Sequence, residues 1–133
     1  MTGALDGVKV IELGTMAAVP GGTAILAEWG AEVIKVEDPD GGDPARTLNV
    51  IADFAGKGQV GPLWEQANRN KRSVTIDFRN QEGRDVLLKL TGQADVFVTS
   101  TRYAGLKRSG LAYDDLRAVN DRIIYCHLSG YGR

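Results

Sequence analysis

The fold is decided by residues 8–37, which read VKVIELGTMAAVPGGTAILAEWGAEVIKVE. Two runs rich in β-branched residues, 8–13 and 31–37, have the composition of buried strands. They flank a stretch whose apolar residues recur at helical spacing, with Pro20 suited to the first helical turn and Gly30 to its end. A strand, a helix and a strand within about thirty residues form a βαβ unit, which predicts a sheet that begins parallel and right-handed.

Strands and helices continue to alternate toward the carboxyl end. The expected elements are helices over 62–67, 81–91 and 113–120 and strands over 73–78, 94–98 and 122–128. Asn80 is the expected N-cap of the central helix, and residues 38–61 and 99–110 are expected to be loops. The alternation predicts one three-layer α/β domain with a mostly parallel sheet.

Length and composition agree with a single globular domain. Of the 133 residues, 43% are hydrophobic and 25% charged, which excludes disordered, collagen-like and disulfide-stapled classes. Sixteen basic and seventeen acidic residues give a net charge of −1, so nonspecific nucleic-acid binding is not expected. No window is long and apolar enough to cross a membrane, and no basic start precedes an apolar stretch, so we expect a cytoplasmic protein without a membrane partner.

Several residues with chemical potential are expected to be structural. Cys126 lies in an apolar run and is expected to be a buried, unreactive thiol in a reducing compartment. Trp29 and Trp64 are expected to pack in the core or between helices. His127, inside the last predicted strand, is expected to have its polar atoms paired within the sheet.

Two aspartates near strand ends are candidates for a catalytic nucleophile. Asp77 and Asp95 each have basic neighbours within a few residues, which predicts lowered pKa values and structural ion pairs instead.

Ligands of open parallel sheets collect beyond the carboxyl ends of the strands, so the loops there are the candidate site. A dinucleotide-binding dehydrogenase is the first hypothesis, because Glu37 and Asp38 end the second strand where an acid can hold a ribose. However, the first turn, residues 14–22, does not read Gly-x-Gly-x-x-Gly, and its bulky side chains would keep a pyrophosphate away from the backbone amides. The sequence therefore disfavours a nicotinamide enzyme.

Basic residues form two local groups beside predicted loops. The groups are Arg69, Lys71, Arg72 and Arg79, and Arg102, Lys107 and Arg108. Together the two groups could hold several phosphates, because arginine forms forked, charge-assisted hydrogen bonds to phosphate oxygens. Charge pattern alone favours the alternative, in which solvated turn residues are balanced by nearby acids.

Four phrases together resemble a known family. They are LDGVKVIELG at 5–14, GAEVIKVE at 30–37, NRNKRS at 68–73, and NDRIIY at 120–125 followed by SGYG at 129–132. In this order they resemble the family III CoA-transferases, the CaiB/BaiF group, which also includes α-methylacyl-CoA racemases.

The resemblance implies the amino-terminal, coenzyme A-binding segment of a Rossmann-like domain over residues 1–133. Nine positions match those that line the coenzyme A site in the family: Thr15, Met16, Ala17, Ile76, Arg79, Ser100, Thr101, Gly105 and Arg108. The resemblance favours phosphate binding by Arg79 and Arg108. Arg72 is instead expected to link a turn to a carboxylate. Residues 99–104 depart from the Glu-Asn-Phe-Arg-Pro-Gly of many members, and Asp38 stands where some carry a basic residue, which puts nucleotide affinity in doubt.

The resemblance also implies a reaction. Family transferases move coenzyme A between an acyl-CoA and a carboxylic acid through an aspartyl intermediate, without a metal, and members form interwoven homodimers. The matching aspartate would lie beyond residue 133; because the chain stops directly after a strand, we expect a truncated piece that is inactive alone. A racemase of the same family, or a noncatalytic coenzyme A-binding or split-subunit chain, are the alternatives.

Overall fold

The computed structural model describes residues 3–47 and 61–132, which contain five strands, five α-helices and one 3₁₀ helix. The strands are β1 (Lys9–Leu13), β2 (Glu32–Glu37), β3 (Arg72–Thr75), β4 (Val96–Thr99) and β5 (Ile124–His127). The helices are α1 (Ala18–Glu28), η1 (Pro44–Arg46), α2 (Pro62–Asn68), α3 (Gln81–Thr91), α4 (Tyr103–Arg108) and α5 (Tyr113–Val119).

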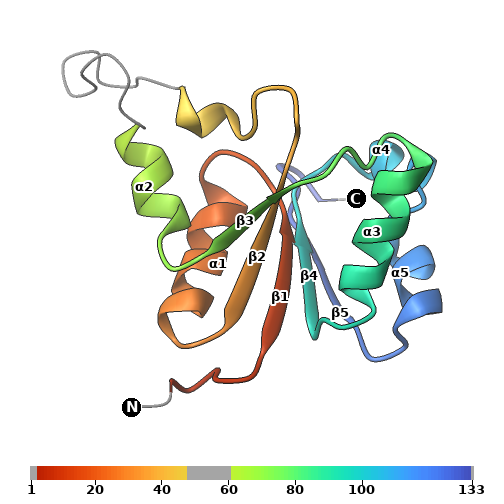
Figure 1. Cartoon of the computed structure of the whole chain (residues 1–133), viewed down its shortest axis with the longest axis horizontal. Coiled ribbons are helices and arrows are strands. Elements are labelled where there is room, and N and C mark those ends of the chain that lie inside the picture. The colour runs from red at the N-terminus through yellow and green to blue at the C-terminus, as the bar shows by residue number, and fades with distance from the viewer. Residues whose placement is uncertain (1–2, 48–60, 133) are drawn as a thin grey trace.

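The five strands form one sheet in the order β3-β2-β1-β4-β5, and every neighbouring pair is parallel. The central strand β1 is flanked on both sides, with Val10 opposite Val33 of β2 and opposite Val96 of β4. Helices α1 and α2 lie on one side of the sheet and α3 and α5 on the other (Figure 1). The predicted three-layer α/β domain with a parallel sheet is therefore confirmed.

Alternate residues of the central strands supply the two faces of the core. Ile11 of β1 and Phe97 of β4 pack with Leu87 of α3 in one cluster, whereas Val10 and Val33 pack with α1 in the other. Burying a side chain of this size stabilises the fold by about 1.5–3 kcal/mol. The continuous β-branched runs are thus explained, because these strands are covered on both faces.

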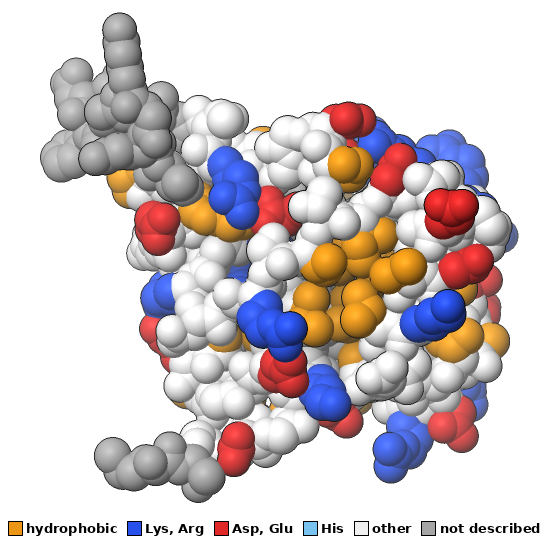
Figure 2. All heavy atoms as spheres, viewed as in Figure 1, with side chains coloured by type: hydrophobic (Ala, Val, Ile, Leu, Met, Phe, Trp, Pro, Cys, Tyr) orange, Lys and Arg blue, Asp and Glu red, His pale blue; other side chains and the backbone are white. Residues whose placement is uncertain are grey.

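The sheet is incompletely covered near its outer strands. Figure 2 shows an apolar patch between β3 and α3. Ile34 of β2 and Val74 of β3 are only partly buried. On the other side, α1 leaves Ile124 and Cys126 of the edge strand β5 exposed. The prediction of a buried thiol at Cys126 was therefore wrong, because an apolar run in an edge strand need not be covered on both faces.

Two further expectations need correction. The predicted loop 99–110 contains helix α4, which is too short to show a helical period but inserts the fully buried Leu106 into the core. Trp29 is 56% exposed after the end of α1, whereas Trp64 is buried as expected. Of the predicted loop 38–61, residues 48–60 lie outside the described residues, and 44–46 form η1.

The remaining predicted elements are present within one to three residues of their expected bounds. Asn80 caps α3 as predicted, because its side chain accepts a hydrogen bond from the Gly83 amide at 2.8 Å. No helix in the described part of the chain is long and apolar enough to span a membrane.

Candidate functional site

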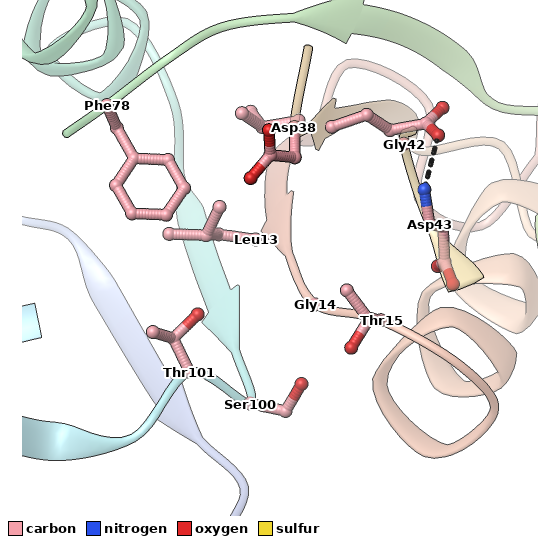
Figure 3. A pocket seen from close by; sticks show the side chains of 11 residues that line it. Leu13, Gly14, Thr15, Asp38, Gly42, Asp43, Phe78, Ser100 and Thr101 are labelled. Carbon is pink, nitrogen blue, oxygen red and sulfur yellow. Dashed lines mark hydrogen bonds between the residues drawn. The ribbon is translucent and has the colours of Figure 1, made fainter. Parts of the chain in front are cut away.

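A hollow lies at the carboxyl end of the sheet, where β1 and β4 meet (Figure 3). It is lined by Leu13, Gly14, Thr15, Val36, Glu37, Asp38, Gly42, Asp43, Phe78, Ser100 and Thr101. Its volume is about 140 Å³. Since pockets for whole ligands typically measure about 300–1,000 Å³, this hollow suits one part of a larger molecule.

The strand order of the sheet explains where the hollow lies. The chain leaves β1 toward β2 on one side and leaves β4 toward β5 on the other, so the loops after β1 and β4 diverge at this point. Such a switch point is where open α/β sheets bind ligands. The two strand ends are joined by hydrogen bonds to the Leu13 carbonyl from the Thr99 hydroxyl at 2.8 Å and from the Ser100 amide at 3.3 Å.

The lining combines three chemical types. Leu13, Val36 and Phe78 provide apolar surface, as an aromatic base requires. Thr15, Ser100 and Thr101 add hydroxyl groups, and the acidic residues Glu37, Asp38 and Asp43 also line the hollow, although the Asp43 side chain is 0% exposed. None of the eleven residues that line this hollow is Lys or Arg. Any phosphate must therefore find its cations at the rim or outside.

Glu37, at the end of β2, is committed to a structural ion pair. It accepts two hydrogen bonds from Arg46, at 2.8 and 2.7 Å. The Asp43 amide also donates to it at 3.1 Å, as Figure 3 shows. Burial acts to raise the pKa of Glu37, but the hydrogen bonds from Arg46, Ser73 and the Asp43 amide outweigh it and lower the pKa to about 2. Glu37 therefore has little free capacity to hold a ribose, which further disfavours a dinucleotide site.

Asp38 shares Arg79 with two other acids at the rim. The Arg79 guanidinium lies 3.1 Å from Asp38, 3.2 Å from Asp40 and 2.7 Å from Asp77. Hydrogen bonds from Arg79 lower the pKa of Asp77, which confirms the predicted structural ion pair. A phosphate would have to compete with these carboxylates for Arg79.

A second hollow of about 560 Å³ adjoins the first, because Ser100 lines both. Its other lining residues come from the start of α4 and the end of β5: Arg102, Tyr103, His127, Leu128, Ser129, Gly130 and Gly132. The His127 ring Nε2 lies 2.9 Å from the Thr101 carbonyl, so the imidazole is paired within the fold as predicted. The two hollows thus lie side by side along the carboxyl edge of the sheet, with Ser100 between them.

The sequence matches one family along almost its whole length: residues 5–133 fit CoA-transferase family III. The chain belongs to this family. It is 44% identical over 135 residues to an acyl-CoA transferase of Fusarium pseudograminearum, and the match covers 98% of this chain and 30% of the relative. It is 38% identical over 128 residues to the (R)-2-hydroxy-4-methylpentanoate CoA-transferase of Clostridioides difficile, covering 96% of this chain and 32% of the relative.

Two solved structures have the same fold as this chain. A crystal structure of a CaiB/BaiF family protein from Brucella suis superposes with a TM-score of 0.90 at 39% identity, covering 99% of this chain and 35% of that one. A hypothetical protein from Mycobacterium tuberculosis superposes with a TM-score of 0.87 at 34% identity, covering 98% and 35%. The chain spans about a third of the length of the relatives it matches.

The structure brings together some of the residues that the family resemblance selected. Thr15, Ser100 and Thr101 line the first hollow, and Met16 and Ala17 continue the same loop from Thr15. Arg79 reaches the rim through Asp38. Gly105 lies in α4, where a Cβ atom would come 3.7 Å from the Thr101 side chain.

Six of the nine selected residues line neither hollow, among them Ile76 and Arg108. Ile76 is buried in the core, and Phe78, two residues later, lines the hollow instead. Arg108 is exposed at the end of α4 and lines neither hollow. The assignment of all nine residues to coenzyme A stays a prediction.

Three members of the first basic group, Arg69, Lys71 and Arg72, form structural ion pairs. Arg72 pairs with the Glu32 carboxylate at 2.6 Å, which confirms the predicted ion pair, and Arg69 pairs with Glu28. Lys71 is not a solvated turn residue, because it is buried against Glu12 at 2.7 Å. Burial lowers the pKa of Lys71, while the charge of Glu12 opposes that shift. In contrast, no ion pair involves Arg102, Lys107 or Arg108 among residues 3–47 and 61–132.

Asp95, at the start of β4, accepts a hydrogen bond from the Lys9 amide at 2.8 Å. The predicted ion pair with a basic side chain is absent from the described part of the chain. Its carboxylate instead joins the amino ends of β1 and β4, far along the strands from the hollow.

Sequence reasoning missed the buried charges beside the site. Glu12 and Lys35 are at most 1% exposed and lie 2.7 Å apart, and Asp43 lies 2.9 Å from Lys35. A signal was present, since both Glu12 and Lys35 interrupt runs whose composition predicts strands covered on both faces. A charge in such a strand must have a buried partner.

Proposed function

We propose that this chain is the coenzyme A-binding part of a CoA-transferase that moves coenzyme A between an acyl-CoA thioester and a carboxylic acid. The observation that supports this most is the pair of adjoining hollows at the β1/β4 switch point of a chain that matches family III CoA-transferases over residues 5–133. The names of the relatives, which include several CoA-transferases for different acids, favour a transferase over a racemase.

Different regions of the two hollows suit different parts of coenzyme A. Adenine would pack on Leu13, Val36 and Phe78, where the hollow is apolar and narrow. The pantetheine arm would then run past Ser100 into the larger second hollow. Phosphates would lie at the rim, near Arg79 on one side and the cations of α4 on the other, because Arg forms forked, charge-assisted bonds to phosphate oxygens.

The chemistry would use an aspartate from outside residues 1–133. Its carboxylate would attack the acyl-CoA carbonyl, forming a mixed anhydride and releasing the coenzyme A thiolate, which then attacks the aspartyl carbonyl and expels the first carboxylic acid as carboxylate. The second acid would attack this aspartyl thioester, and the released thiolate would then attack the new acyl group and restore the aspartate. The residues described here would hold and orient coenzyme A throughout. We also propose that the full-length protein forms a homodimer in the cytoplasm.

Calorimetric titration of the chain with coenzyme A tests the binding role. We expect saturable binding that adenosine competes with, and no binding of NADH. Arg108→Ala should weaken binding about tenfold if this cation meets a phosphate, whereas Arg117→Ala on α5 is the matched control. No detectable coenzyme A binding would refute the proposal, and equal affinities of wild type and Arg108→Ala would refute the phosphate role of Arg108.

A further inference from the structure

Four buried charged side chains form a network beside the loop that follows β1. Lys35 Nζ lies 2.9 Å from Asp43 Oδ2 and 2.7 Å from Glu12 Oε1, and Lys71 Nζ lies 2.7 Å from Glu12 Oε2. All four side chains are at most 2% exposed. Two lysines and two acids balance in charge, which is the condition under which buried charges are tolerated.

The network also holds the backbone on both sides of Thr15. Lys35 Nζ donates to the Gly14 carbonyl at 2.8 Å. The carboxylate of Asp43 accepts from the Met16 amide, at 3.0 Å to one oxygen and 3.2 Å to the other. Because Thr15 lines the first hollow, the network fixes the wall of that hollow from behind.

Met16 needs this support. Its φ is 67°, in the left-handed region that disfavours a residue with a Cβ atom. Met16 and Asn70 are the two residues other than glycine with positive φ in the described part of the chain. A strained residue persists where surrounding contacts fix its conformation, and such residues gather at ligand sites.

The Asp43 carboxylate also accepts a hydrogen bond from the Met16 amide, a donor that could otherwise bind a ligand. In dinucleotide-binding α/β folds, amides of the loop after β1 face a phosphate. Here the Met16 amide is already bonded to a carboxylate of the protein. A ligand phosphate at this amide would meet the negative charge of Asp43.

We propose that Asp43 is a positioning residue for the coenzyme A site: its buried carboxylate acts as a built-in anion that fixes residues 14–16 and directs ligand phosphates away from this loop. This inference rests on the proposed function for the identity of the ligand. Asp43 itself is held by Lys35 and is fully buried, so it acts through the loop.

The test combines Asp43→Asn, which keeps the shape but removes the charge, with Asp85→Asn, a control at an exposed acid of α3. We expect Asp43→Asn to weaken coenzyme A binding about tenfold by calorimetry and to speed hydrogen exchange of the Met16 amide about tenfold by NMR. Asp85→Asn should change neither. Adding Met16→Gly to Asp43→Asn should recover affinity about threefold, since glycine adopts this φ without a Cβ clash. A general loss of stability would give no such rescue.

A second pair of variants keeps Asp43 in place. Met16→Val introduces a β-branched residue that disfavours positive φ, so it should bind coenzyme A about threefold more weakly than Met16→Gly. A folded Asp43→Asn with wild-type affinity, or equal affinities of the two Met16 variants, would overturn the positioning role. If the wild type binds no coenzyme A, the proposed function fails. In that case the positioning role is tested by hydrogen exchange alone, and an unchanged exchange rate of the Met16 amide in Asp43→Asn would overturn it.

Discussion

Lys35 Nζ and Glu12 Oε1 meet 2.7 Å apart inside the sheet, with side chains that are 1% and 0% exposed. The two residues come from neighbouring parallel strands and are register partners. Glu12 also accepts from Lys71 and from the Thr23 hydroxyl, so one carboxylate joins β1, β2, α1 and the turn before β3. Removing it would leave two buried lysines without their shared partner.

We therefore predict that Glu12→Gln lowers the free energy of unfolding by about 3–5 kcal/mol, because breaking a buried pair leaves an uncompensated charge. Urea denaturation followed by circular dichroism measures this change. The matched control is Glu32→Gln, which breaks the exposed pair with Arg72 and should cost less than about 1 kcal/mol. Equal losses in the two variants would contradict the prediction.

Glu37 predicts a pH dependence of stability. Its pKa is lowered from 4.5 to about 2 in the folded chain, so the unfolded state binds a proton first as the pH falls. Its stabilising contribution is complete above pH 4.5 and is lost as the pH falls through about 2. We expect the contribution to be about 2 kcal/mol, since the Arg46 partner is 35% exposed and screened by solvent.

Urea denaturation at steps between pH 2 and 6 tests this contribution. The difference in stability between the wild type and Glu37→Gln should shrink steadily as the pH falls across that range. A difference that stays constant from pH 6 to pH 2 would show that Glu37 is not the titrating group.

Arg79 and Asp38 predict opposite effects on ligand binding. If Arg79 binds a phosphate of coenzyme A, Arg79→Ala should weaken affinity about tenfold, whereas Asp38→Asn should strengthen it about threefold by freeing the guanidinium. Lys89→Ala, at an exposed cation of α3, is the charge-matched control for Arg79. Weaker binding by Asp38→Asn would instead indicate that Asp38 contacts the ligand directly.

At Gly83 we expect alanine to destabilise a helix, which is unusual for this residue type. A Cβ atom at Gly83 in α3 would lie 2.0 Å from the Asp77 carbonyl oxygen, a backbone atom that cannot move without shifting the chain. Gly83→Ala should therefore lower stability by about 1–3 kcal/mol, although alanine favours helices. At Gly92 the same atom would have ordinary contacts of 3.5 Å, so Gly92→Ala should be neutral or stabilising. Thermal unfolding of the two variants gives the comparison.

Sequence periodicity predicted most of the fold because the central strands and longer helices carry strong local patterns. The runs 8–13 and 31–37 read as strands without any tertiary information, and Asn80 capped α3 where expected. Helix α4 was missed because one and a half turns show no period, and Leu106 is held by the core. Cys126 was misplaced because composition cannot tell an edge strand from a central one.

By itself, the sequence determined an α/β chain with a parallel sheet, candidate binding loops beyond the carboxyl ends of its strands, and a family resemblance carried by ordered phrases. Only the tertiary structure decided which charges meet: it placed Lys71 in the interior, bound Arg79 to three acids and brought Asp43 to the Met16 amide. The physical reason is that strand and helix patterns depend on near neighbours in the chain. Electrostatic partners up to 59 residues apart become neighbours only when the sheet assembles.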